Sequence, residues 1–162
     1  MIYKYLSFSI SITVISWMVG MIINAGLKKT AFYNQNLSNL NFIKSGILNK
    51  MIGLHYFKWI VKNTFFKFFN QKIKLDRRID YSDINKLRSE MTASEIDHLI
   101  GFVFVTMFAS VKFYNFNFTF GLIMMFVNVL MNLYPSLLQQ ENKRRIDRLI
   151  KVYAEKNNFN KL

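Results

Sequence analysis

Three apolar segments, each flanked by charged or polar residues, divide the chain. They cover residues 5–25, 93–112 and 116–138. A helix of about 20 apolar residues is long enough to cross the hydrocarbon core of a bilayer. The pattern therefore predicts three transmembrane helices. The second and third segments meet at the short, aromatic stretch "KFYNFN", residues 112–117, so we expect a helical hairpin whose tip lies at the membrane interface.

The first segment has a competing interpretation as a cleaved signal peptide with Ala25 at the cleavage site. Its apolar run is long for a signal peptide, only Lys4 precedes it, and Lys28 and Lys29 follow it. We therefore expect residues 5–25 to remain as a membrane anchor.

The middle of the chain has a different pattern, with apolar residues at helical spacing and lysines between them. This predicts an amphipathic helix over about residues 49–70 that lies in the headgroup region. Its apolar positions are Leu54, Phe57, Val61, Phe65 and Phe68. A polar connector, residues 71–92, follows, and after the last span we expect a basic helix to about residue 156. The predicted fold is an all-α integral membrane protein whose single domain covers residues 1–162.

The charge distribution gives this fold an orientation. Thirteen Lys and Arg residues lie between Lys28 and Arg88, seven lie between Lys143 and Lys161, and the net charge is +13. By the positive-inside rule, the middle segment and the C-terminal helix are cytoplasmic, and the N-terminus is outside. The mean hydropathy is positive, which argues against a soluble nucleic-acid-binding protein. We expect a multi-pass protein of the bacterial cytoplasmic (inner) membrane.

Amide side chains and a proline lie on one face of the third span and its continuation. At 100° per residue, Asn128, Asn132, Gln139 and Asn142 fall within an arc of roughly 80° that also includes Pro135. Amides facing lipid are costly, so this face must contact protein, water or a ligand. Such a row can be the wall of a binding site, or it can join helices through hydrogen bonds. Four amides together with a proline favour the wall.

The second span begins with Glu95 and His98, which are three residues apart and share a helix face. A carboxylate beside an imidazole can orient the ring and raise its basicity, as a general base requires. The alternative is an acidic helix start with a histidine that reaches the interface. In the predicted topology, Gln139 and Asn142 lie at the same depth as this pair. Arginines follow at 144, 145 and 148, where they could hold a phosphate or simply be part of the positive-inside signal.

The sequence lacks a Gly-rich phosphate loop, a His/Cys metal cluster and a G-x-S-x-G motif. We therefore predict no metal and no cofactor. His55 lies among aromatic residues in the amphipathic helix and is expected to be interfacial.

A Glu-x-x-His motif followed by Asn…Pro…Gln-x-x-Asn-x-x-Arg resembles the glycosyl-4,4'-diaponeurosporenoate acyltransferase family, over roughly residues 91–151. The resemblance implies a small bacterial membrane protein that esterifies a fatty acyl chain onto a sugar hydroxyl of a carotenoid glycoside. Its last motif tends to read Gln-Arg-Tyr-Asn-Arg-Pro-Arg, and this chain instead has Gln140, Glu141 and Arg144 at the Arg, Tyr and Pro positions. The matching residues are Glu95, His98, Asn132, Gln139, Asn142 and Arg145.

The leading prediction is acyl transfer to a hydroxyl of a lipid or glycolipid, with His98 as general base and Glu95 orienting it. Asn132, Gln139 and Asn142 would bind the acceptor or the oxyanion. Arg145 would hold an acyl-CoA or acyl-carrier donor. The alternative is a non-catalytic small subunit that docks on a larger membrane protein complex.

Overall fold

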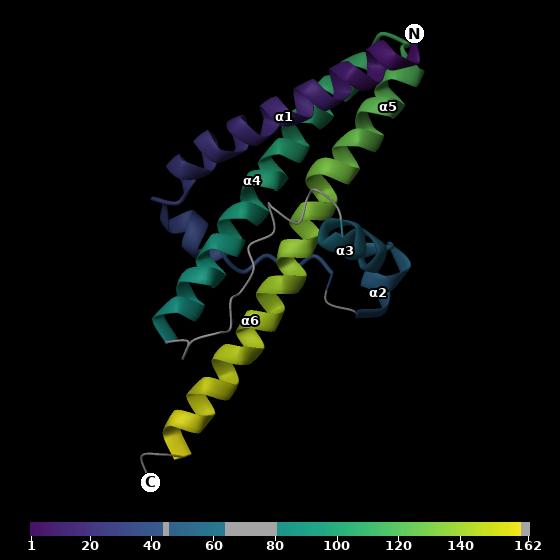
Figure 1. Cartoon of the computed structure of the whole chain (residues 1–162). Coiled ribbons are helices and arrows are strands. Elements are labelled where there is room, and N and C mark those ends of the chain that lie inside the picture. The colour runs from purple at the N-terminus through teal and green to yellow at the C-terminus, as the bar shows by residue number, and fades with distance from the viewer. Residues whose placement is uncertain (44–45, 64–80, 160–162) are drawn as a thin grey trace.

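The computed structural model describes residues 1–43, 46–63 and 81–159, and all regular structure in this part of the chain is helical (Figure 1). Three stretches are long and apolar enough to cross a membrane, which confirms the predicted all-α membrane fold. The elements are α1 (Ile2–Leu27), the π-helical turn η1 (Tyr33–Leu37), α2 (Gly46–Met51), α3 (Leu54–Asn63), α4 (Tyr81–Tyr114), α5 (Phe118–Asn128), the π-helical turn η3 (Val129–Leu133) and α6 (Tyr134–Phe159).

Helix α4 occupies the centre of the fold and packs against α1, α5 and α6. Elements α5, η3 and α6 follow one another as a single long rod that runs antiparallel to α4 (Figure 1). The N-terminus lies beside the α4–α5 connection, and the C-terminal end of α6 lies at the opposite end of the molecule (Figure 1). The basic residues of α6 are therefore far from the N-terminus along the long axis of the fold.

Two predicted segments fall partly outside the described residues. The interfacial helix is represented by α2 and α3, whereas residues 64–70, with Phe65 and Phe68, lie outside them. Of the polar connector, residues 71–80 also lie outside, and residues 81–92 form the first turns of α4.

Helix α3 packs one side on α6, as its apolar spacing predicts. Leu54 is fully buried, and it forms a cluster with Leu137 and Leu138, to which Phe57 and Val61 add their side chains. On the other side, Tyr56, Trp59 and Ile60 are exposed. The helix is therefore held on the rod by one apolar face, and the aromatic side chains of Tyr56 and Trp59 are exposed, as expected of an interfacial helix.

Helix α1 turns a stripe of small and polar side chains, together with Ile12, toward α4 and α5, and most of its large apolar side chains are exposed. The hydroxyls of Ser9 and Thr13 donate to the carbonyl oxygens of Tyr5 and Ser9 within the helix, each at 2.7 Å. Small residues let helix backbones approach closely, which drives helix association in lipid. The buried stripe consists of Ser9, Thr13, Ser16, Gly20 and Asn24.

Helix α1 approaches the backbone of α4 closely at Gly20. A Cβ added there would lie 2.3 Å from the backbone oxygen of Asp97. Four residues on, the Asn24 amide donates to the Asp97 carboxylate at 2.6 Å and to the Ala93 carbonyl at 3.0 Å. The lack of a side chain at position 20 is thus what allows the Asn24 contacts to form.

We expect Gly20→Ala to lower the free energy of unfolding by about 1–3 kcal/mol, the usual cost of overpacking. Gly26→Ala is the matched control, because a Cβ at Gly26 meets no atom within 4 Å. Thermal unfolding of the purified protein in mild detergent measures both variants. Equal melting temperatures would contradict this packing of α1 on α4.

Candidate functional site

Asn132 lies at the centre of a buried polar cluster contributed by α1, α4, α5 and η3. Its side-chain amide donates to the Ser16 hydroxyl at 3.1 Å and to the Asn128 side-chain oxygen at 2.9 Å. Its side-chain oxygen accepts the indole N–H of Trp17 at 3.0 Å and lies 3.5 Å from Nδ1 of His98. We call Ser16, Trp17, His98, Asn128 and Asn132 the amide cluster.

The amide cluster assigns the proton on His98. The indole nitrogen of Trp17 can only donate, so the Asn132 atom that it contacts is the acceptor oxygen. Nδ1 of His98 lies 3.5 Å from this same oxygen, which favours the tautomer with the proton on Nδ1. The lone pair is on Nε2, for which the described part of the chain supplies no partner. Trp17 also packs edge-on against the His98 ring, at 6.1 Å between centroids, and limits its orientation.

Asn128 extends the cluster one turn toward the N-terminal end of the rod. Its amide donates to the Phe102 carbonyl at 2.9 Å and to the Thr106 hydroxyl at 3.1 Å, both on α4. Asn128 and Asn132 are fully buried. Both amides therefore join helices, which is the alternative that the sequence left open for them.

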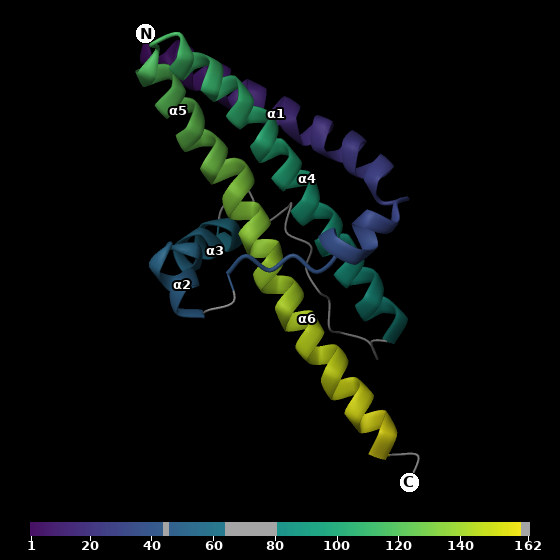
Figure 2. The ribbon, with the colours of Figure 1, turned by 180° about the vertical axis from the view of Figure 1, so that it is seen from behind.

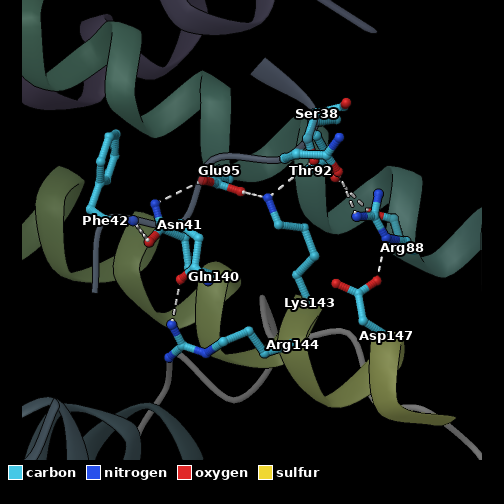
Figure 3. A network of polar contacts seen from close by, with 12 residues as sticks. Ser38, Asn41, Phe42, Arg88, Thr92, Glu95, Gln140, Lys143, Arg144 and Asp147 are labelled. Atoms are coloured by element: carbon cyan, nitrogen blue, oxygen red, sulfur yellow. Dashed lines mark hydrogen bonds and ion pairs between the residues drawn. The ribbon is translucent and has the colours of Figure 1, made fainter. Parts of the chain in front are cut away.

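A second polar cluster surrounds Glu95, one turn of α4 before His98 (Figure 3). The Glu95 carboxylate accepts the ammonium of Lys143 at 2.6 Å and the amide of Gln140 at 2.8 Å. The Glu95 side chain is 0% exposed and that of Lys143 is 4% exposed. We call Glu95, Gln140 and Lys143 the ion-pair cluster, and it binds α4 to α6.

The ion-pair cluster also anchors residues 38–43, which cross α4 and α6 on the face seen in Figure 2. Lys143 donates to the Ser38 carbonyl at 3.3 Å, and the Phe42 backbone N–H donates to the Gln140 side-chain oxygen at 3.0 Å. Arg144 donates to the Asn41 side chain at 2.7 Å and to the Ile43 carbonyl. We call residues 38–43 the strap. It connects η1 to α2 and is held by these side chains of α6 and by Arg88 of α4, which donates to the Asn39 side chain at 3.0 Å.

The six predicted site residues divide into four groups by their contacts. Glu95 and His98 share α4, but Glu95 contacts Gln140 and Lys143, whereas His98 contacts Asn132. Gln139 and Asn142 are half-buried, and no described residue partners their side chains. Arg145 is 52% exposed and pairs with Glu141 one turn earlier, at 2.8 Å.

The π-helical turn η3 explains why Gln140 and Lys143, rather than Gln139 and Asn142, meet Glu95. A π-helical turn contains one residue more than an α-helical turn, so it rotates every later side chain by about one position. It lies directly before Pro135, which has no N–H to donate and whose ring would clash with a carbonyl one turn earlier. Beyond this turn, a count of 100° per residue from Asn132 predicts the wrong side chains for the face that meets α4. The residue that lies there is one position later in the sequence than the count gives.

Four of the residues at the two clusters were not singled out from the sequence: Ser16, Trp17, Gln140 and Lys143. Lys143 lies in a basic run that the positive-inside rule already explained, so its burial gave no separate signal. Ser16 could have been found, because it belongs to the regularly spaced polar stripe of α1. No group of three or more His, Cys, Asp or Glu side chains that could hold a metal ion occurs among the residues described.

One family model matches this chain, over residues 28–152, and its description is glycosyl-4,4'-diaponeurosporenoate acyltransferase. The chain belongs to this family. The resemblance drawn from the two motifs is confirmed, and the match extends beyond them into the strap and the interfacial helix. Comparisons with curated proteins and with solved structures give no match. In this member of the acyltransferase family, both motif regions contribute to the two buried clusters.

Removing one partner of a buried ion pair should lower the free energy of unfolding far more than removing one partner of an exposed ion pair. We expect Lys143→Ala to lower the free energy of unfolding by about 3–5 kcal/mol, because the Glu95 carboxylate would stay buried without a cation. Arg145→Ala is the matched control, since its exposed pair with Glu141 should contribute about 0–1 kcal/mol. Thermal unfolding in detergent compares the two.

A second variant separates the charge from the packing. Combining Lys143→Met with Glu95→Gln removes both charges and keeps the volume, so it should recover much of the lost stability. If Lys143→Ala and Arg145→Ala unfold at the same temperature, the ion-pair cluster does not hold α4 on α6.

Proposed function

We propose that this protein is a membrane acyltransferase that moves a fatty acyl group from a thioester donor to a hydroxyl of a lipid or glycolipid acceptor. Its family is named for acyl transfer to a glycosylated carotenoid acid, which supports the reaction class. The observation that carries the assignment within this chain is His98, whose Nδ1 faces Asn132 while Nε2 has no partner among the described residues. A histidine fixed in this tautomer is ready to accept a proton.

The reaction needs one base and no covalent nucleophile. Nε2 of His98 takes the proton of the acceptor hydroxyl as its oxygen attacks the thioester carbon. The new C–O bond forms, the C–S bond breaks, and the imidazolium returns the proton to the departing thiolate. The products are an ester and a free thiol, so atoms and charges balance.

The contacts suggest different roles for the predicted site residues. Both donors of the Asn132 amide are used within the amide cluster, so Asn132 would position His98 rather than bind the oxyanion. Glu95 would act at a distance, by holding α6 and the strap against α4. The unpartnered amides of Gln139 and Asn142 remain available for the acceptor or the oxyanion.

The membrane and its sides belong to the same proposal. Three apolar helices support insertion in a bilayer, and the positive-inside rule places α6 and the interfacial helix in the cytoplasm of a bacterial cell. On this side of the membrane, α6 and the interfacial helix would be accessible to cytoplasmic acyl-CoA or to an acyl-carrier protein. The donor would approach the end of the molecule that carries Arg145, and the acceptor would enter from the cytoplasmic leaflet.

The rival function is a non-catalytic subunit that docks on a larger membrane protein. It is favoured by the observation that Asn128 and Asn132 use all their hydrogen-bonding groups within the protein, as purely structural amides would. Under this alternative His98 is also structural, and replacing it would affect assembly or stability without affecting any acyl transfer.

We expect His98→Ala to lower the rate of acyl transfer by about 10²–10⁴-fold, the usual contribution of a general base. Added imidazole should restore part of the lost rate, because the small base can enter the space that the ring leaves. The assay follows transfer from an acyl thioester to extracted membrane glycolipids by purified protein in detergent.

Asp97→Asn is the matched control on the same helix. It removes a charge beside His98 and keeps an oxygen that can accept the Asn24 amide, so transfer should continue at a similar rate. Full activity of His98→Ala would exclude His98 as the base. Loss of activity that imidazole never restores, accompanied by a lower melting temperature, would favour the structural role.

A further inference from the structure

A basic cavity of about 610 Å³ lies between α2–α3 and α6, at the end of the molecule that carries Arg145, and His98 does not line it. Its walls include His55, Glu141 and Asp147. They also carry six cationic side chains: Lys50, Lys58, Arg144, Arg145, Arg148 and Lys151. With His55 neutral, six cations against two carboxylates leave a net charge of +4. Like charges collected around a concave space repel one another, and a bound anion would relieve that repulsion.

The two carboxylates do not neutralise the cavity. Glu141 lies between Lys58, at 2.9 Å, and Arg145, at 2.8 Å. Asp147 pairs at 2.5 Å with Arg88 of α4, which does not line the cavity. Four cations are left without an acidic partner among the described residues, and they come from both walls: Lys50, Arg144, Arg148 and Lys151. Of these, Arg144 donates to the neutral Asn41 side chain and the Ile43 carbonyl.

The shape of the cavity favours a small molecule over a protein surface. Its volume is within the range of about 300–1,000 Å³ that is usual for small-molecule sites. A folded carrier protein would present a convex face, which cannot fill a space of this size. A nucleotide carrying a pyrophosphate and a ribose phosphate matches both the volume and the charge, and His55 offers an imidazole beside which a base can pack.

We propose that this cavity binds the nucleotide and phosphate groups of a coenzyme A thioester, the acyl donor. This inference rests on the proposed acyl transfer and names the donor class for it. Arg144 follows Asn132 by twelve residues, or about 18 Å along the helix axis. Along the helix axis, the distance from the His98–Asn132 contact to the cavity is thus comparable to the length of an extended pantetheine arm.

The test measures binding by the full-length protein in a neutral detergent, using isothermal titration calorimetry with coenzyme A, ADP and inorganic phosphate. We expect coenzyme A to bind most tightly, and the double variant Arg148→Ala/Lys151→Ala to weaken it by about tenfold or more. Lys50→Ala, on the opposite wall, should weaken it independently. The matched control is Lys28→Ala/Lys29→Ala, which removes the same charge from exposed residues outside the cavity and should leave affinity unchanged.

Other occupants would give other results. If phosphatidylglycerol vesicles bind through Arg148 and Lys151 and coenzyme A does not, the cavity holds a lipid headgroup, and the proposal is overturned. Binding of an acyl-carrier protein without binding of coenzyme A overturns it too, as does binding of coenzyme A that none of these cavity variants changes.

The His98→Ala protein keeps the failure of this inference separate from the failure of the proposed function. Its affinity for coenzyme A should equal that of the unmodified protein, because His98 does not line the cavity. Unchanged coenzyme A binding together with undiminished transfer would refute the chemistry and leave the donor site standing. Normal transfer from a different donor, with no coenzyme A binding, would refute only the donor site.

Discussion

A carboxylate that is wholly withdrawn from solvent has to be neutralised inside the protein, and in this chain that carboxylate belongs to Glu95. Its partner Lys143 is nearly as buried, and the two charged groups are 2.6 Å apart. Separating them would leave an unpaired charge in a medium of low dielectric constant. That costs far more free energy than burying the two charges as a pair. Lys143 and Gln140, the two partners of Glu95, also hold the strap, so the neutralisation of one side chain fixes α4, α6 and the path from α1 to α2.

The spans themselves could be predicted because the length and mean hydropathy of a segment are local properties of the sequence. Which side chains contact one another between helices could not be predicted in this way. The expected row of amides runs through η3, where one extra residue in the turn moves Gln140 and Lys143 into the positions computed for Gln139 and Asn142. Pro135 indicated that the helix would be distorted at this level. It did not indicate whether the backbone would kink or would insert a residue, which depends on packing against α4.

The face of α1 that packs against α4 and α5 could not be predicted for a different reason. Averaged hydropathy describes residues 5–25 as a uniform anchor and hides a stripe of hydroxyls, a glycine and an amide at spacings of three and four. In lipid, large apolar side chains gain nothing by facing another helix, so the small polar face is the one that packs. The same stripe supplies Ser16, which holds the amide of Asn132, and Trp17 follows directly. The anchor is thus part of the environment of His98.

Gln140 occupies one of the three positions, with Glu141 and Arg144, at which this chain differs from the motif of the resemblance, and that motif tends to have an arginine there. A guanidinium can only donate hydrogen bonds, whereas the Gln140 amide donates to Glu95 and accepts the Phe42 N–H of the strap. An arginine could supply a second cation for Glu95, but it would leave the Phe42 N–H without that acceptor. With glutamine in place of arginine, the site has one positive charge fewer near Glu95 and gains an acceptor for the Phe42 N–H. It leaves Lys143 as the only direct cationic partner of Glu95 among the described residues, and it makes the strap depend on the same side chain that orients the carboxylate.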